Sequence, residues 1–210
     1  AAAAVVGSRF AVELVERVLD QDLVDAFEEA AQAGIVIEEP GGHYRFNHAI
    51  VRQSLLAELA SVRRMRLHQH IAATLESRPG AGDELLAELA YHYFECAWAG
   101  NAVKAVEYCR RAADQAMARL GYEGAAELYG RALHALEEID EDLPDRPDQT
   151  AELLLARCEA LLAAGDVTSA AGTVTQLHSS TVNSDRLAAW ATCFDGQLAM
   201  LTHPERLDEI

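Results

Sequence analysis

Three segments of this chain share a spacing that is typical of a closely packed α-helix. After breaks at Gly100, Gly121 and Gly165, small or apolar residues recur at intervals of three, four and three. The three sets are Ala102, Ala105, Cys109 and Ala112; Tyr122, Ala125, Tyr129 and Ala132; and Val167, Ala170, Val174 and Leu177. Alanine holds the second place in each set, and a small residue at a contact lets two helices approach closely. With 40 alanines among 210 residues and only 6% aromatic residues, the chain is expected to be mainly helical.

This spacing resembles the second helix of tetratricopeptide (TPR) repeats. We therefore expect residues 62–210 to form a TPR-like array of helical hairpins, an α-solenoid, with an acidic linker near 137–149. The expected helices cover 62–75, 84–98, 102–120, 122–139, 151–164, 167–178 and a stretch beginning near 185, and the first six are expected to pair in order. The second alanines lie 20 and then 45 residues apart, whereas TPR units recur at about 34 residues, so the array is predicted to be degenerate.

The first 61 residues carry a different pattern. Apolar periodicity predicts helices over 1–6, 10–19 and 21–33. A β-hairpin is expected next, with arms over 35–39 and 43–46 and a turn at Pro40-Gly41-Gly42. Three helices followed by a hairpin predict a winged-helix subdomain over residues 1–61.

The segment after the hairpin is predicted to be a strand that turns into a helix over 47–61. Asn47 is the expected N-cap. His48 and Arg52 then lie one turn apart on a single helix face, away from the apolar ridge. Two hydrogen-bond donors on one face suit an anionic ligand.

The charge distribution argues against nucleic acids and anionic membranes as direct partners. The net charge is −17, and residues 81–210 carry 9 basic against 23 acidic residues, a balance that repels phosphate. The third predicted helix, the one a winged helix would place in a DNA groove, has four carboxylates and no Lys or Arg. The basic cluster at 63–70 is interpreted as a solvated helix face.

The sequence shows no apparatus for catalysis. It has no phosphate-binding loop, its only lysine is Lys104, and no G-x-S-x-G, H-E-x-x-H or clustered Cys and His is present. His68 and His70 are two residues apart and do not share a helix face, which argues against a metal site there. The four scattered cysteines predict buried thiols in a reducing compartment. We expect a non-enzymatic cytoplasmic protein without a membrane span or a cofactor of its own.

Three segments resemble one known family. Residues 3–10 (AAVVGSRF), 44–52 (YRFNHAIVR) and 63–68 (RRMRLH), together with the Pro-Gly-Gly hairpin, are similar to the winged helix and following helices of STAND-type signalling ATPases. The nearest groups are the MalT-like, LuxR-family transcriptional regulators and the ATPase-linked adenylyl and guanylyl cyclases. The resemblance covers roughly residues 1–140. It implies that His48, and with it Arg52, contacts ADP or ATP bound to an upstream nucleotide-binding domain. Ala49 stands where many relatives have an aspartate.

Three hypotheses follow for the function. In the first, the chain is a regulatory segment of a STAND-type transcriptional regulator; it relays nucleotide state and binds an effector or partner protein on the TPR-like face. In the second, the same module regulates a class III nucleotidyl cyclase. In the third, it is a stand-alone TPR-like interaction scaffold, and a homo-oligomer stays open in all three. The missing initiator Met and the unfinished array lead us to expect a segment of a longer chain.

Overall fold

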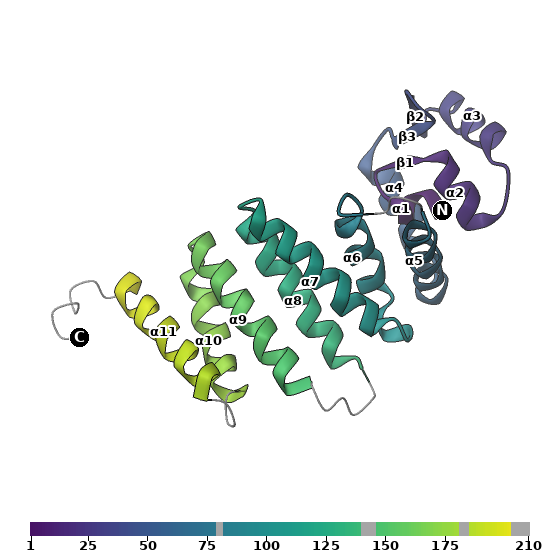
Figure 1. The fold of residues 1–210 in the computed structure, drawn as a ribbon. Helices are drawn as coiled ribbons and strands as arrows, with labels where there is room; N and C mark the ends of the chain where they lie inside the picture. Colours follow the sequence, from purple (N-terminus) through teal and green to yellow (C-terminus); the bar gives the residue numbers. More distant parts are fainter. Residues whose placement is uncertain (79–81, 140–145, 181–184, 203–210) are drawn as a thin grey trace.

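The structure, a computed structural model, describes residues 1–78, 82–139, 146–180 and 185–202. Within these residues the chain is mainly helical and carries one small antiparallel sheet (Figure 1). The elements of the first part are α1 (Ala2–Val6), β1 (Arg9–Ala11), α2 (Val12–Leu19), α3 (Val24–Gln32), β2 (Val36–Glu39), β3 (His43–Phe46), α4 (Ala49–Ala57) and α5 (Ser61–Glu76). The second part comprises α6 (Leu86–Glu95), the 3-10 turn η1 (Ala97–Ala99), α7 (Ala102–Ala118), α8 (Tyr122–Glu137), α9 (Arg146–Ala164), α10 (Val167–Ser180) and α11 (Asp185–Thr202).

The sheet has three strands rather than the two of the expected hairpin. Its order is β1-β3-β2, with Phe10 opposite Tyr44 and Val36 opposite Phe46. The prediction that Phe10 begins a helix was wrong, because residues 9–11 pair with β3 and the helix starts at Val12. The Phe10 ring contacts three other rings, those of Phe27, Tyr44 and Phe46. This aromatic packing favours the strand over one more helical turn.

The joint between strand and helix lies where the sequence places it, but its cap differs. Residues 43–46 are strand and α4 begins at Ala49, so His48, not Asn47, is the N-cap residue. The Asn47 amide donates instead to the Gly34 carbonyl at 3.0 Å, and its backbone N–H donates to Ile35 at 3.1 Å. Asn47 therefore ties the end of the hairpin to the segment that follows α3.

Helix α5 connects the two parts of the molecule. It packs on α1 and α2 as well as on α6, and a continuous apolar cluster runs from α1 and α2 through α5 to α11. A separate aromatic cluster fills the space under the sheet. The expected boundary after residue 61 stays a prediction, since α5 contacts both parts.

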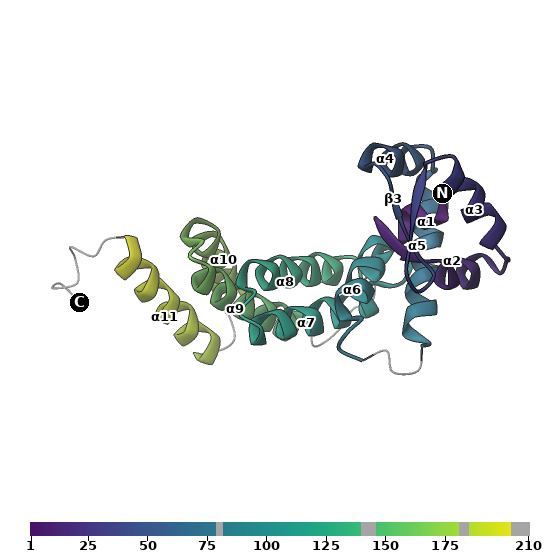
Figure 2. The ribbon, with the colours of Figure 1, turned by 90° about the horizontal axis from the view of Figure 1, so that it is seen from above.

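The helices from α6 onward pack in sequence order. Each contacts the next, and α6 also contacts α8 as α9 contacts α11. Figure 2 shows α7 and α9 in one layer and α8 and α10 in the other. The alanines at the second place of the sequence pattern, Ala105, Ala125 and Ala170, are fully buried. The close helix contacts predicted from the spacing are therefore present.

The start of α9 differs from the prediction, and parts of the two expected linkers lie outside the described residues. Helix α9 begins at Arg146, five residues before the predicted start at 151, so the last residues of the expected linker are helical. Pro147 suits this position, because proline is tolerated in the first helical turn. The acidic residues 140–145 lie outside the described residues, as do 79–81 of the expected linker after α5.

Candidate functional site: a groove between α7 and α9

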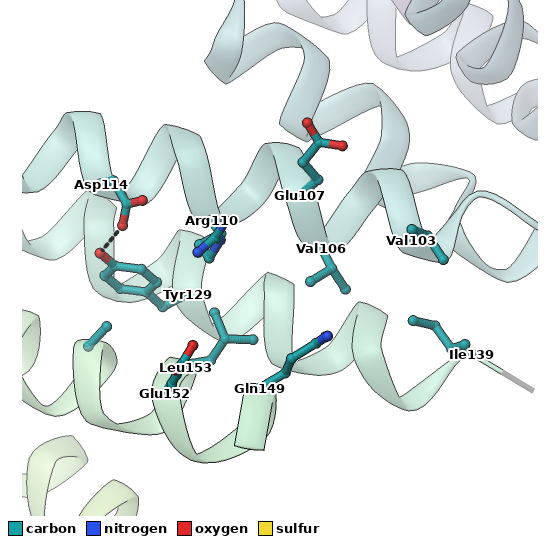
Figure 3. Close-up of a pocket in the computed structure, with 11 residues that line it drawn as sticks. Val103, Val106, Glu107, Arg110, Asp114, Tyr129, Ile139, Gln149, Glu152 and Leu153 are labelled. Atoms are coloured by element: carbon teal, nitrogen blue, oxygen red, sulfur yellow. Dashed lines mark hydrogen bonds between the residues drawn. The ribbon is translucent and has the colours of Figure 1, made fainter. Parts of the chain in front are cut away.

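A groove of about 560 Å³ lies between α7 and α9, with α8 beneath it (Figure 3). Its volume is in the range of protein sites that hold small ligands or peptide side chains. One side comes from α7, the other from α9, and Tyr129 of α8 and Ile139 complete it. The groove therefore lies in the layer of the stack that contains α7 and α9.

Helical periodicity explains why α7 presents these residues. Val103, Val106, Arg110 and Asp114 are spaced three or four apart and share one face of the helix. The buried residues of α7 lie on the remaining face, and they include Ala105, Cys109 and Ala112, Ala113. The same helix thus packs with one face and lines the groove with the other.

One end of the groove is polar and is organised by Tyr129. Its hydroxyl donates to the Asp114 carboxylate at 2.7 Å, and its ring is buried. Burial raises the pKa of the Tyr129 phenol, and the hydrogen bond to Asp114 raises it further. The phenol therefore stays protonated and holds the Asp114 side chain in place (Figure 3).

Arg110 lines the groove near Tyr129 and has no hydrogen-bond or ion-pair partner among the described residues (Figure 3). Within the described residues its guanidinium makes no hydrogen bond or ion pair, because Asp114 is engaged by Tyr129 and Glu107 pairs with Arg111. It lies near enough to Tyr129 to act on the phenol electrostatically. A guanidinium offers five N–H donors in a planar fork, so Arg110 is available to an incoming acceptor.

The other end of the groove is apolar. Val103, in the first turn of α7, is 63% exposed. Val106 and Ile139 lie toward the same end of the groove as Val103, whereas Leu153 lies near Tyr129 (Figure 3). The groove therefore combines an apolar end, at which Val103 is exposed, with a polar end held by the hydrogen bond between Tyr129 and Asp114, which is the usual composition of a binding site.

The residues singled out from the sequence, His48 and Arg52, lie elsewhere, on α4. His48 is exposed at the N-cap in an extended conformation, and its imidazole makes no hydrogen bond to the described residues. Arg52 is half-buried, and its Nε donates to the Ala4 carbonyl at 2.9 Å. No hydrogen bond joins the two side chains in the described chain; Arg52 is anchored to α1, and the His48 imidazole has no hydrogen-bond partner there.

The joint between the two parts of the molecule holds a buried histidine pair that the sequence analysis missed. The Nδ1 atoms of His68 on α5 and His92 on α6 lie 2.9 Å apart, and both residues are buried. Burial lowers the pKa of His68 to about 4, with Arg64 and Arg52 adding to the effect, and lowers that of His92 to about 3. Both rings are neutral at pH 7, and one donates to the other. His92 is 24 residues from His68, so no short-range spacing links them.

Glu76 forms the second contact at this joint. Its carboxylate accepts hydrogen bonds from Tyr93 at 2.6 Å, Lys104 at 2.6 Å and Tyr108 at 2.9 Å. Burial opposes ionisation of Glu76, but these three donors outweigh it and hold the carboxyl pKa below its ordinary value. The only lysine of the chain is therefore used in a contact between α5, α6 and α7.

The cysteines differ from the expectation at one position. Cys96, Cys109 and Cys158 are buried, and burial raises the pKa of their thiols to about 11, 12 and 12. Cys193 on α11 is exposed, which corrects the prediction that all four are buried. Among the described residues no group of three or more His, Cys, Asp and Glu side chains is arranged to hold a metal ion. No helix in the described part of the chain has the length and apolar character needed to cross a bilayer.

Comparisons with protein-family models, with curated proteins and with solved structures gave no match to this chain.

Proposed function

We propose that this chain is a non-catalytic regulatory segment of a larger signalling protein, and that the groove between α7 and α9 binds a partner protein. The groove itself carries the proposal. The stack buries the other faces of α7 and α8 closely, yet in the described part of the chain it leaves Val103 exposed and Arg110 without a hydrogen-bond or ion-pair partner in the same groove. Exposed apolar surface beside an unpaired guanidinium is stabilised when a partner covers it.

The arrangement of the N-terminal part supports the family proposed for the larger protein. Its elements follow in the order α1-β1-α2-α3-β2-β3, with a helix starting directly after the last strand, and we interpret this as a winged helix. In a STAND-type regulator the unit would adjoin an upstream nucleotide-binding domain. The exposed His48 imidazole suits contact with a nucleotide phosphate, and Arg52 would add its terminal guanidinium nitrogens. The acidic α3 would not enter DNA, so direct nucleic acid binding is not part of the proposal.

A selection from a displayed peptide library tests the groove. The matched pair of variants is Arg110→Glu, in the groove, and Arg119→Glu, at the exposed end of the same helix. Both make the same charge change, and circular dichroism checks that both fold. We expect selected peptides to lose at least tenfold in affinity for Arg110→Glu and to bind Arg119→Glu unchanged. Peptides that bind Arg110→Glu equally well contradict the proposal.

The role of His48 is tested in the full-length protein that contains the nucleotide-binding domain. We expect His48→Ala to weaken ADP binding and to raise basal output, because the contact belongs to the resting state. His70→Ala, which replaces another exposed histidine on α5, is the control. If the two variants have equal ADP affinity and equal basal activity, His48 has no role in nucleotide binding or in the resting state.

A further inference from the structure

The charges around the groove favour a basic partner. Among the described residues, its lining holds Glu107, Asp114 and Glu152 against one cation, Arg110. The surrounding part of the chain, residues 81–210, has 23 acidic and 9 basic residues. Both the local lining and the long-range field therefore attract a cation and repel an anion.

Arg110 sets a second condition on the ligand. A cationic side chain cannot lie against this guanidinium, so it must lie toward a carboxylate, either that of Glu107 on α7, which also pairs with Arg111, or that of Glu152 on α9 (Figure 3). Arg110 itself needs neutral acceptors in an acidic surrounding. The carbonyl oxygens of a peptide backbone meet that need.

The apolar end sets the third condition. Val103 and Glu107 lie four residues apart on α7, which is about 6 Å along a helix axis. In an extended peptide, residues two apart point to the same side and are separated by about 6.6 Å. A peptide can therefore place one side chain against Val103 and Ile139 and the next on the same side near Glu107.

Together these conditions define the ligand. We propose that the groove binds an extended peptide segment in which a basic residue stands two positions from a large apolar residue, with backbone carbonyls accepting from Arg110. This inference rests on the proposed docking function of the groove and specifies its partner. Burial of a large apolar side chain is favourable, so the apolar contact supplies affinity and the carboxylates supply selectivity.

Three labelled octapeptides, acetylated and amidated at their ends, test the proposal by fluorescence anisotropy. They share one sequence except at two positions two apart, which carry Lys and Leu, Glu and Leu, or Lys and Ser. We expect the Lys and Leu peptide to bind at least tenfold more tightly than either of the others. Its affinity should also fall as salt is raised, since the attraction is screened.

Two double variants test the carboxylates. Glu107→Gln with Glu152→Gln removes the charges of the groove, whereas Glu123→Gln with Glu127→Gln removes two from α8. The pairs are matched, because Glu107 and Glu127 each pair with an arginine four residues on. We expect the groove pair to bring the Lys and Leu peptide close to the affinity of the Glu and Leu peptide, and the α8 pair to change little.

The possible failures separate the two proposals. If the Glu and Leu peptide binds as tightly as the Lys and Leu peptide, and Arg110→Glu abolishes both, the basic ligand is wrong and the docking function remains. If Arg110→Glu changes the binding of none of the peptides, and none from the displayed library, both proposals fail.

Discussion

The N-terminal part, residues 1–59, and the stack from α6 to α11 build their cores in different ways. The N-terminal part relies on a cluster of aromatic rings under a three-stranded sheet, and neither α3 nor α4 has a fully buried residue. In the stack, α7, α8 and α9 each bury six residues, many of them alanine. The stack therefore gains its stability from repeated close contacts, whereas the N-terminal part depends on a few large side chains. Few buried contacts mean low local stability, so α3 and α4 are expected to open before the stack does.

The largest effect is expected at the joint between these two parts, where His68 and His92 meet. An unfolded histidine has a pKa near 6.5, and burial lowers the folded values to about 4 and about 3. The unfolded chain therefore binds more protons below pH 6.5, and the free energy of unfolding falls as pH falls toward 4. The loss is roughly 3 kcal/mol for each excluded proton.

Urea unfolding at pH 7, 5.5 and 4.5 measures this loss. The comparison is with the double variant His68→Leu/His92→Leu, which keeps the site filled and has nothing to titrate there. We expect the wild type to lose stability more steeply than the variant across this range. If the free energy of unfolding falls equally with pH in the two proteins, the buried histidine pair is not the cause of the loss.

A change within the aromatic cluster should lower the local stability of the N-terminal part and leave that of the stack unchanged. Phe10→Ala removes a ring that contacts three others, and such a truncation costs about 3–5 kcal/mol. Hydrogen exchange should show lost protection in residues 1–59 while α7 to α10 keep theirs. Phe194→Ala on α11 is the matched control, since it removes a buried ring at the far end of the stack. Equal loss of protection throughout the chain for Phe10→Ala would mean that the parts unfold as one unit.

A smaller effect is expected from enlarging a helix contact in the stack. Ala125 is fully buried between α8 and its neighbours, and Ala125→Leu should cost about 1–3 kcal/mol through overpacking. For a chain of this size that lowers the melting temperature by about 2–4 °C per kcal/mol. Ala118→Leu, at an exposed position of α7, should leave it nearly unchanged. Similar melting temperatures for the two variants would mean that the stack tolerates a large residue at this recurring position.

Local patterns predicted most of the helices and both arms of the hairpin. They succeed where one face of an element is buried repeatedly, as at Ala105, Ala125 and Ala170. They failed at Phe10, because a three-residue strand is decided by its partner β3, 34 residues away at Tyr44. They also placed the start of α9 too late. The composition of Arg146-Pro147-Asp148 is typical of a linker, but these residues form the first turn of the helix.

The sequence predicted that a partner would bind on the face of the TPR-like array, but it did not predict which residues form the groove. Val103, Arg110 and Asp114 have a helical spacing that could have marked an exposed mixed face on α7. Tyr129 and Glu152 come from other helices, and nothing in the sequence shows that they meet. The same holds for His68 and His92, which tertiary packing alone brings together.

The smallest effect tests the corrected cap at the strand-to-helix joint. If Asn47 mainly ties the hairpin to Gly34, then Asn47→Ala loses one partly exposed hydrogen bond, worth about 0.5–1.5 kcal/mol. The neighbouring change His48→Ala removes no hydrogen bond in the described chain and should stay within about 0.5 kcal/mol of the wild type. Chemical denaturation of both variants, with hydrogen exchange at Ile35 and Gly34, measures the difference. A loss for His48→Ala as large as that for Asn47→Ala would contradict this assignment, because it would make His48 part of the fold and weaken its interpretation as a free ligand-binding side chain.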